Sequence, residues 1–463
     1  MTAPRIAVVG CGYLGAVHAA GMASLGLDTV GIDVDAARVA TLQAGSAPFF
    51  EPGLDAMLRA GIDGGTLRFQ ADAAGVEADV WFVCVGTPQQ PGSDAADLTF
   101  VDAAIAGLLP ALREGMLVVG KSTVPVGTAE RLAALVEPTG ARLAWNPEFL
   151  REGLAVTDTL APDRLVYGVR DGDDAAVAAL DEVYASILAR DTPRIVTDFA
   201  TAELVKVSAN AFLATKISFI NAIAEVAEHA GADVVQLADA IGIDARIGRR
   251  FLGAGIGFGG GCLPKDIRAF RARSIEIGAP EALGLLDEVD RINQRRRDRM
   301  VELVERELTA LGGGAVAMLG LAFKPDSDDV RDSAALDVAM RLAERHDVVA
   351  YDPQAAAPAA RRAPQLRIVD ALDDALAGAA VVALGTEWRE FRELDPIDVA
   401  TRTSARVVVD GRNALDRDAW TAAGFRVVAI GRPDRDPSAP RDPSAPGDPS
   451  APGDPSHDQE ARA

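Results

Sequence analysis

The sequence predicts an α/β fold with two Rossmann-like, doubly wound domains joined by a long central helix. Short apolar runs alternate with helical stretches near both ends of the chain, as in a parallel sheet that helices cover on both faces. Between these regions, residues 201–231 contain no proline and have glycine only at the end, which indicates one uninterrupted helix. With 463 residues, 49% of them hydrophobic, the chain can fill more than one core.

The first domain is expected to begin with buried strands that alternate with Ala-rich helices. The apolar run RIAVV is followed by a helical stretch and then by a second apolar run, TVGI. The expected strands are residues 5–9, 29–32, 80–85 and 117–120, and the expected helices are residues 17–25 and 35–43.

The last third of the chain repeats this alternation, which predicts a second domain of the same kind. Its strand-like runs are residues 314–319, 347–351, 380–384, 405–410 and 425–430. We therefore expect an N-terminal domain over 1–200, a central helical dimerisation region over 201–300 and a C-terminal domain over 301–431. Residues 432–463 consist largely of DPSAP units with little to bury, so a disordered tail is expected there.

The composition argues against several kinds of partner. A formal net charge of −22 would repel DNA and anionic membranes, so neither is expected as a partner. No apolar run approaches a membrane span and the N-terminus lacks a cleavable signal pattern, which favours a cytoplasmic protein. Cys11, Cys84 and Cys262 have unrelated spacings, so we expect neither a disulfide framework nor a metal site.

A glycine-rich turn follows the first expected strand. Gly10, Gly12 and Gly15 have the spacing that permits a tight turn, close approach of the backbone to a pyrophosphate and close helix packing. Asp33 follows the next strand, where a carboxylate binds the adenosine ribose hydroxyls and repels a 2′-phosphate. The sequence therefore predicts a dinucleotide site that prefers NAD to NADP. Cys11 lies in the turn and Cys84 in a strand, where packing is the better explanation of both.

Two polar segments come after later strands, KSTVPVGT (121–128) and NPEFLREG (146–153). Ligands bind at the carboxyl ends of strands in such sheets, so Thr123 is a candidate to hold a water or the nicotinamide. Glu148 and Glu152 are four residues apart and could share a helical face as general acid or base. From spacing alone, two ordinary surface charges are the favoured interpretation.

Lys206 and Asn210 are also four apart, on the expected long helix. Their common face would place a cation beside an amide donor, which suits stabilisation of an alkoxide or a tetrahedral oxyanion. The alternative is a solvated lysine and an asparagine that packs between helices.

The segment FLGAGIGFGGGCLPKD (251–266) is the most informative in the chain. Its glycines would let the backbone wrap closely around a ligand. Cys262 follows them at once, Pro264 suits a first helical turn, and Asp266 comes one turn after the cysteine. A thiol at a helix N-terminus has its thiolate favoured by the helix dipole, which makes Cys262 a candidate nucleophile.

Taken together, these motifs resemble the UDP-glucose/GDP-mannose dehydrogenase family, and most closely its members that oxidise UDP-glucose. The resemblance runs from Arg5 to about Arg432 and includes GCGYLG, FFEPGL, KSTVPVGT, NPEFLREG, the AELVK…AN…KISFIN helix, RIG, GFGGGCLPKD, LAFKPDSDDVRDS and DGRN, in that order. Two departures are Ala161, where an acidic residue is frequent, and Gly253, where some members have a basic residue.

The resemblance implies a four-electron, NAD-dependent oxidation of UDP-glucose to UDP-glucuronate. Water held by Thr123, Glu148 and Lys206 would take the C6 hydroxyl proton. Cys262 would then capture the aldehyde as a thiohemiacetal and carry it to a thioester, while Lys206 and Asn210 stabilise the oxyanion. Water activated through Asp266 or Glu152 would hydrolyse the thioester.

The resemblance also implies contacts for both ligands, with NAD in the N-terminal domain and the nucleotide diphosphate of a UDP-sugar between the two domains. Arg246 would reach the substrate of a neighbouring subunit, in a homodimer or larger homo-oligomer. The implied cofactor contacts are Gly10, Gly12, Tyr13, Leu14, Gly15, Asp33, Arg38, Thr87, Thr123, Glu152, Lys265 and Arg331. The implied substrate contacts are Glu148, Phe149, Leu150, Lys206, Asn210, Arg246, Phe251, Leu252, Gly253, Gly257, Gly259, Phe323, Lys324 and Arg412. For Arg246, Arg331, Arg412 and Lys324, surface salt bridges are the alternative role.

Three other functions stay open at this point. The same chemistry could act on GDP-mannose or a UDP-N-acetylhexosamine. A two-electron hydroxyacid dehydrogenase is disfavoured because one hydride transfer needs no thiol at Cys262. A non-catalytic nucleotide-sugar sensor is disfavoured because it would need neither the nucleophile nor its helpers.

Overall fold

The computed structural model describes residues 3–435 of the chain. The chain divides into two compact units. Unit 1 comprises Met1–Asn210 and Lys265–Leu283, and unit 2 comprises Ala211–Pro264 and Gly284–Ala463. Residues 201–300, expected as one central region, are shared by the two units. The expected boundaries at residues 200, 300 and 431 stay predictions, and most of the expected disordered tail lies outside the described residues.

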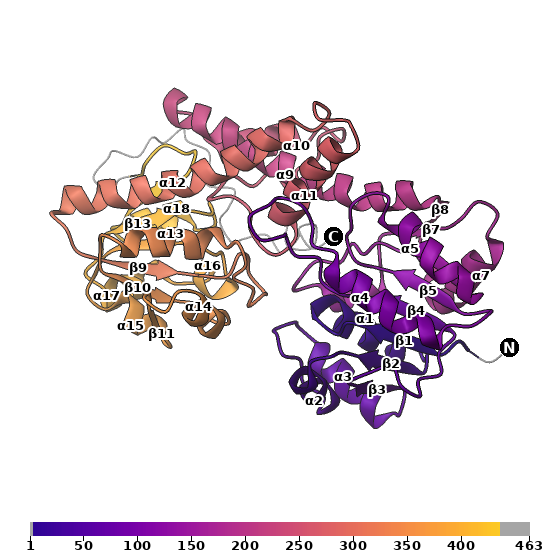
Figure 1. Ribbon diagram of the computed structural model, residues 1–463. Helices are drawn as coiled ribbons and strands as arrows, with labels where there is room; N and C mark the ends of the chain where they lie inside the picture. Colours follow the sequence, from indigo (N-terminus) through magenta and orange to yellow (C-terminus); the bar gives the residue numbers. More distant parts are fainter. Residues whose placement is uncertain (1–2, 436–463) are drawn as a thin grey trace. The chain divides into compact units, whose positions relative to one another are not determined.

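The described part of unit 1 contains one eight-stranded sheet in the order β3-β2-β1-β4-β5-β6-β7-β8 (Figure 1). Its strands are β1 (Ile6–Val9), β2 (Thr29–Ile32), β3 (Leu67–Gln70), β4 (Val80–Val83), β5 (Leu117–Gly120), β6 (Arg142–Trp145), β7 (Leu165–Gly168) and β8 (Arg194–Thr197). Its helices are α1 (Tyr13–Ser24), α2 (Ala36–Gln43), α3 (Leu54–Asp63), α4 (Thr99–Leu108), α5 (Thr128–Val136), α6 (Ala155–Leu160), α7 (Asp174–Val183) and α8 (Ala185–Leu188), with the turns η1 (Leu109–Ala111) and η2 (Glu137–Thr139).

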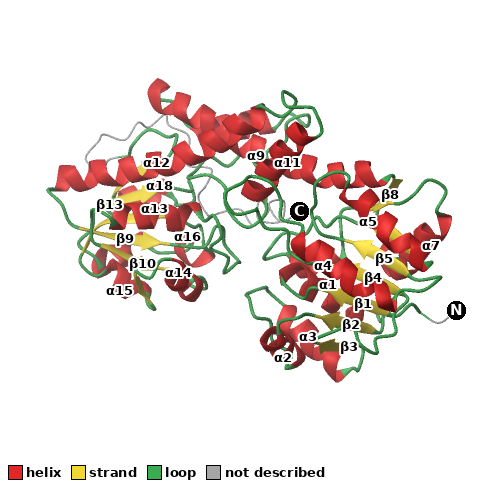
Figure 2. Cartoon of the chain, viewed as in Figure 1, coloured by secondary structure: helices red, strands yellow, loops and turns green. Residues whose placement is uncertain are grey.

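Alternate strand residues build two cores, one on each face of this sheet. Ile6 and Val8 of β1 pack with α1 in one core, whereas Ala7 packs with residues of α4 and α5 in the other. Helices therefore cover both faces, as the cartoon in Figure 2 shows for this unit. The first six strands are parallel, and β7 joins them antiparallel through Trp145 and Gly168.

Unit 2 repeats the topology with a six-stranded parallel sheet in the order β11-β10-β9-β12-β13-β14 among the described residues. Its strands are β9 (Ala315–Leu319), β10 (Val348–Tyr351), β11 (Arg367–Val369), β12 (Ala379–Leu384), β13 (Val407–Asp410) and β14 (Arg426–Ala429). Its helices are α10 (Val234–Gly242), α12 (Leu285–Leu311), α13 (Ala334–Ala343), α14 (Ala356–Arg362), α15 (Leu372–Leu376), α16 (Arg389–Arg392), α17 (Pro396–Arg402) and α18 (Arg417–Ala422). The expected α/β class with two Rossmann-like domains is confirmed.

The expected long helix is confirmed as α9 (Phe199–Ala230), which runs from unit 1 into unit 2. Within residues 3–435, α9 alone is long and apolar enough to cross a membrane by length and composition. However, it carries the buried polar residues Glu203, Asn210 and Ser218, which bond to other parts of the protein. These contacts are those of a core helix. A second helix, α11 (Leu263–Glu276), begins at the boundary between the units.

Candidate active site

The turn after β1 has the geometry that a dinucleotide requires. Gly10 has a φ of 86°, and a side chain on Gly15 would bring its Cβ within 1.9 Å of the Gly10 carbonyl oxygen. Both positions therefore require glycine. A Cβ on Gly12 would meet nothing within 4 Å, so this backbone lies open beside the N-terminus of α1. An open, positively polarised helix N-terminus is a site for a pyrophosphate.

Asp33 lies directly after β2 and faces the same turn. It is 6% exposed, and its carboxylate accepts hydrogen bonds from the Cys11 N–H at 2.8 Å and the Asp35 N–H at 2.9 Å. The Arg38 guanidinium donates to both of its oxygens, at 3.0 and 2.9 Å. A carboxylate in this place fits the ribose hydroxyls of a dinucleotide, and residues Gly10–Asp33 together fit NAD.

Glu51 is a buried residue of this region that the sequence patterns did not single out. Its carboxylate accepts from the backbone N–H groups of Gly153 at 2.6 Å and Ala155 at 2.7 Å, and from the Tyr13 hydroxyl. Burial and this carboxylate raise the pKa of Tyr13. Glu51 thereby ties the glycine turn to the NPEFLREG loop and caps α6. No local pattern marks such a contact, because its partners lie about a hundred residues away along the chain, at separations of 102 and 104.

Thr87 and Thr123 meet at the carboxyl ends of β4 and β5. The Thr87 hydroxyl donates to the Thr123 carbonyl oxygen at 2.8 Å. The Lys265 ammonium lies 3.4 Å from the same hydroxyl and 2.6 Å from an Asp266 carboxylate oxygen. Three residues expected to bind the cofactor, Thr87, Thr123 and Lys265, are therefore close neighbours.

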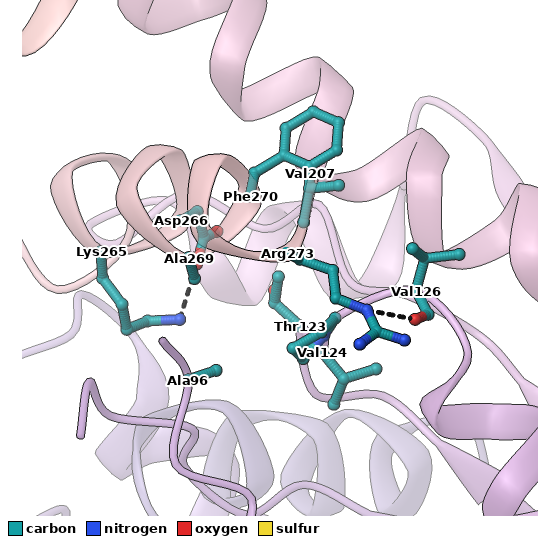
Figure 3. Close-up of a pocket in the computed structure, with 11 residues that line it drawn as sticks. Ala96, Thr123, Val124, Val126, Val207, Lys265, Asp266, Ala269, Phe270 and Arg273 are labelled. Atoms are coloured by element: carbon teal, nitrogen blue, oxygen red, sulfur yellow. Dashed lines mark hydrogen bonds and ion pairs between the residues drawn. The ribbon is translucent and has the colours of Figure 1, made fainter. Parts of the chain in front are cut away.

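A pocket lies beside this group within unit 1, as Figure 3 shows. Side chains of α11 form one side of it, and the loop that carries Thr123 forms another. Val207 of α9 also lines the pocket, and Figure 3 shows it near Phe270. The lining residues are Ala96, Thr123, Val124, Pro125, Val126, Val207, Lys265, Asp266, Ala269, Phe270 and Arg273.

The expectation that Glu148 and Glu152 share a helical face is wrong. Residues 146–153 form a loop, and α6 begins only at Ala155. The Glu148 carboxylate instead accepts from the N–H groups of Phe149 at 2.8 Å and Leu150 at 3.1 Å. These bonds stabilise a turn that competes with a helix.

Glu148 is also not a surface charge, because it pairs with a buried lysine. The Lys121 ammonium, on a side chain 4% exposed, lies 3.0 Å from its carboxylate and 3.0 Å from the Asn146 amide oxygen. Burial lowers the pKa of Lys121, but the Glu148 carboxylate and Tyr184 outweigh it and raise the pKa above its ordinary value. Lys121 stays charged and holds Glu148 in one orientation.

Lys206 and Asn210 of α9 have different surroundings. The Lys206 ammonium lies 5.3 Å from the centroid of the Phe149 ring, which the Arg164 guanidinium approaches to 4.0 Å. Asn210 is 7% exposed and donates from its amide to Asp266 at 2.6 Å. Asp266 is itself 2% exposed, so this bond connects α9 to α11 in a dry environment.

Cys262 directly precedes α11, the helix that carries Lys265 and Asp266. Pro264 lies in the first turn of this helix, as expected. Cys262 is exposed, whereas Cys11 and Cys84 are buried, and burial raises the pKa of Cys84 to about 12. The thiol in the position of the expected nucleophile is thus the accessible one among the three.

In unit 2, the side chain of Asn293 holds the glycine loop after residue 250 through two hydrogen bonds. The sequence did not predict a role for this residue. The amide of Asn293, on α12, accepts from the Phe258 N–H at 2.8 Å and donates to the Phe258 carbonyl oxygen at 2.9 Å. A Cβ on Gly257 would lie 2.3 Å from the same amide oxygen, and Gly257 has a φ of 96°. Glycine is required here so that the loop can follow α12 closely.

Two other expected substrate residues of unit 2, Phe323 and Arg412, lie against this loop. Arg412 donates to the carbonyl oxygens of Gly257 at 2.9 Å and Phe323 at 3.3 Å, and burial lowers its pKa. The ring of Phe323 lies within 2.7 Å of where a Cβ of Gly260 would be, and the Lys324 ammonium lies 5.5 Å from the ring centroid. A Cβ on Gly259 would lie 2.3 Å from the Asp332 carbonyl oxygen.

Two expected arginines of unit 2 are solvent-facing. Arg331, with a side chain 64% exposed, pairs with Asp329 at 2.6 Å, and its carbonyl oxygen accepts from the Gly260 N–H. Arg246, 89% exposed, pairs with Asp244 at 2.6 Å. A second cavity, of about 190 Å³, is lined by Val234, Val235, Asp239, Arg249, Leu252, Gly253, Ala254, Arg412 and Asn413. It lies against the Leu252–Ala254 part of the loop, where Phe251 has a φ of 65°.

Comparison with known proteins identifies the family. Three domain models of the UDP-glucose/GDP-mannose dehydrogenase family match the chain in order: the NAD binding domain at 4–188, the central domain at 200–295 and the UDP binding domain at 317–417. The chain belongs to the UDP-glucose/GDP-mannose dehydrogenase family.

Individual relatives agree over nearly their whole length. The chain is 38% identical to a UDP-glucose 6-dehydrogenase of Rhizobium meliloti over 93% of its own length and 100% of that protein. It is also 38% identical to UDP-glucose 6-dehydrogenase TuaD of Bacillus subtilis, over 93% of each chain. The solved structure of a UDP-glucose dehydrogenase from Pyrobaculum islandicum superposes with a TM-score of 0.83 at 37% identity, covering 93% of this chain and 98% of that one.

Membership of this dehydrogenase family agrees with the geometry of both units. The glycine turn and Asp33 of unit 1 lie within the matched NAD binding domain, so the chain is an NAD-dependent oxidoreductase. The segment that contains Phe323, Lys324 and Arg412 lies within the matched UDP binding domain. The roles of the individual site residues remain predictions. Among residues 3–435, no group of three or more His, Cys, Asp or Glu side chains could hold a metal ion.

Proposed function

We propose that this dehydrogenase oxidises the C6 hydroxyl of UDP-glucose to a carboxylate, giving UDP-glucuronate. The observation that carries the proposal is an exposed thiol, Cys262, placed between a glycine-rich loop and the first turn of α11. A single hydride transfer needs no thiol, whereas a second oxidation of an aldehyde needs a covalent adduct that can release another hydride. Relatives named UDP-glucose 6-dehydrogenase support the choice of sugar.

In the first step, water held by Thr123, Glu148 and Lys206 takes the proton of the C6 hydroxyl. Bound NAD supplies the two-electron acceptor in each of the two oxidations, so two molecules are consumed per substrate. Lys121 supports this step because its ammonium pairs with Glu148 and holds that side chain in one orientation. The product of the step is an aldehyde.

In the second step, the Cys262 sulfur attacks the aldehyde carbon and forms a thiohemiacetal, whose oxyanion Lys206 and Asn210 stabilise. Loss of a hydride from C6 leaves a thioester. Water activated through Asp266 or Glu152 then breaks the carbon–sulfur bond, which releases the carboxylate and restores the thiol. The hydrogen bond from Asn210 to Asp266, at 2.6 Å, supports joint action of these two groups.

The test is the yield of NADH per sugar nucleotide consumed, measured with UDP-glucose, GDP-mannose and UDP-N-acetylhexosamines. Two NADH per UDP-glucose, with turnover lost in Cys262→Ser, is the expected result. Cys84→Ala is the matched control, because it removes a buried thiol and should keep two NADH per substrate. A yield of one NADH would overturn the four-electron reaction, and preference for another sugar would overturn the substrate.

We also propose that the chain acts as a homodimer or larger homo-oligomer in the cytoplasm. Phe212, Phe219 and Val226 repeat every seven residues along α9 and are 66%, 50% and 64% exposed. Such a stripe fits a second copy of the same helix, and the exposed Arg246 is available to a neighbouring subunit's substrate. Phe219→Glu should shift the mass measured by light scattering to that of a monomer. A cytoplasmic location suits a Cys262 that must remain a thiol.

A further inference from the structure

Glu203 is a buried carboxylate that the reaction described above does not use. It lies on α9, three residues before Lys206, and is 2% exposed. Carboxylates are rarely buried without a specific set of donors. A buried Glu203 therefore requires specific hydrogen-bond donors.

Its partners belong to the loop that carries Thr123. One carboxylate oxygen accepts from the Gly127 N–H at 2.7 Å, and the other accepts from the Ala129 N–H at 2.7 Å. These N–H groups belong to the N-terminus of α5, whose N-cap residue is Gly127 and so has no side chain to offer. Serine, threonine or aspartate at the N-cap normally supplies this acceptor. Here the acceptor comes from a residue 74 and 76 positions away.

A second tether comes from α11. The Arg273 Nε donates to the Val126 carbonyl oxygen at 2.9 Å, as Figure 3 shows. Glu203 and Arg273 therefore hold consecutive residues of one loop from two different helices. These are the helices that carry Lys206, Asn210 and Asp266, and the loop leads back to Thr123 three residues earlier.

We propose that Glu203 is a positioning residue, which fixes the Thr123 loop against Lys206 and Asn210 and thereby sets the geometry of proton removal from C6. The proposal rests on the function proposed above for Thr123 and Lys206. Glu203 itself touches neither substrate nor cofactor, because both of its oxygens face backbone N–H groups of α5. Misplacement of such a loop by about 1 Å costs up to roughly a hundredfold in rate.

The arrangement also makes the position of the loop depend on pH. Burial raises the pKa of Glu203 to about 7, although the N–H groups of Gly127, Thr128 and Ala129 and the Arg273 guanidinium of α11 lower it. When the carboxyl is protonated, one of its oxygens carries a hydrogen. That oxygen then accepts a hydrogen bond from a backbone N–H less well than a carboxylate oxygen does. The loop should therefore be held by both bonds only above about pH 7.

The decisive experiment compares Glu203→Gln with Glu203→Asp and wild type across pH 5.5–9, a range chosen to bracket the Glu203 pKa. In Glu203→Gln, the amide –NH₂ cannot accept a hydrogen bond, so kcat with UDP-glucose should fall about tenfold while KM changes less than about twofold. The kcat step near pH 7 should also disappear. Glu203→Asp keeps the charge and should restore part of kcat together with a shifted pH step. Asp173→Asn, at the N-cap of α7 in the same unit, is the matched control and should leave kcat and its pH dependence unchanged.

Amide hydrogen exchange over residues 121–136 gives a readout that requires neither a substrate nor an active variant. In wild type, this segment should exchange faster at pH 6 than at pH 8 after correction for intrinsic rates, and Glu203→Gln should exchange fast at both. The proposal is overturned if exchange and the kcat profile are the same in Glu203→Gln as in wild type. Absence of UDP-glucose oxidation by wild type would instead overturn the function proposed above. The exchange data would still show whether Glu203 holds the Thr123 loop in place.

Discussion

The two sheets share one strand order but use the same topological position differently. In each, an aspartate directly follows the second strand: Asp33 after β2 and Asp352 after β10. Each accepts hydrogen bonds from the backbone of the turn after the first strand, Asp33 from Cys11 and Asp352 from Leu321 and Ala322. In both units, therefore, a carboxylate after the second strand accepts backbone hydrogen bonds from the turn after the first strand.

The difference lies in what else each carboxylate binds. Asp352 also accepts from the N–H groups of Gln354 and Ala355 and from the Trp388 indole at 3.1 Å, and it is 2% exposed. Its acceptor capacity is consumed by the protein. Asp33 also pairs with Arg38, whose side chain is 35% exposed. A ligand hydroxyl can therefore replace the Arg38 guanidinium as the hydrogen-bond donor to Asp33. One carboxylate is structural and the other is available to NAD.

The largest effect should come from Asp352→Ala, which leaves a set of buried N–H donors without an acceptor. We expect the free energy of unfolding to fall by about 3 kcal/mol, because each orphaned buried donor costs about 1–3 kcal/mol and the site relaxes in part. Urea denaturation measures this loss. NAD affinity of the folded fraction, measured by calorimetry, should be unchanged; a matching loss of NAD affinity would contradict the comparison.

Asp33→Asn should show the reverse pattern. The amide oxygen can still accept from the Cys11 N–H, so stability should change by less than about 1 kcal/mol. NAD affinity should fall about tenfold, which corresponds to about 1.4 kcal/mol. If instead stability fell as far as in Asp352→Ala with NAD binding intact, Asp33 would be a structural residue too.

Two glycines of the turn after β1 are also expected to differ, one affecting NAD binding and the other affecting stability. Gly12→Ala adds a methyl group to open space, so the melting temperature should stay within a few degrees while NAD affinity falls about tenfold. Gly15→Ala would force a Cβ onto the Gly10 carbonyl oxygen, so it should lower stability by about 2 kcal/mol. Equal effects of both substitutions on thermal unfolding would show that the turn has no open ligand face.

The smallest effects concern two carboxylates of α9 with opposite pKa shifts, Glu203, which is buried, and Glu228, which is partly buried. Burial raises the pKa of Glu203 to about 7, above the ordinary 4.5, so its contribution favours folding below pH 4.5 and is lost as pH rises through 7. Burial also acts to raise the pKa of Glu228, but Arg296 and Arg299 outweigh it and lower the pKa, so its stabilisation is present above pH 4.5 and is lost at lower pH.

Between pH 7 and 5, the melting temperature of Glu203→Gln should therefore rise less than that of wild type. Below pH 4.5, Glu228→Gln should be less sensitive to acid than wild type. Differential scanning calorimetry of both variants at pH 4, 5 and 7.5 checks the two signs. The same pH dependence of the melting temperature in both variants would contradict the opposite pKa shifts of Glu203 and Glu228.

Much of the site was predictable because its signals are local. The three glycines after β1, Asp33 after β2 and Cys262 before α11 each follow from a residue type beside a strand or helix end, where backbone geometry limits the choice. The strand β2 lies at residues 29–32 as expected, because all four residues are buried and apolar or small. By contrast, β3, β6, β7, β8 and β11 were not predicted. Of these strands, β3 alternates with polar residues and β8 is largely exposed.

The sequence by itself determined the fold class, the family and the positions where ligands should bind, since these depend on short-range patterns of glycine, charge and apolar spacing. Only the tertiary structure decided how the polar groups are shared. It shows Glu148 in a loop paired with Lys121, Glu51 and Glu203 capping helices far away in the chain, and Asn293 clamping Phe258. Buried carboxylates and amides bond to whichever donors the packing brings near, and no local pattern records which donors those will be.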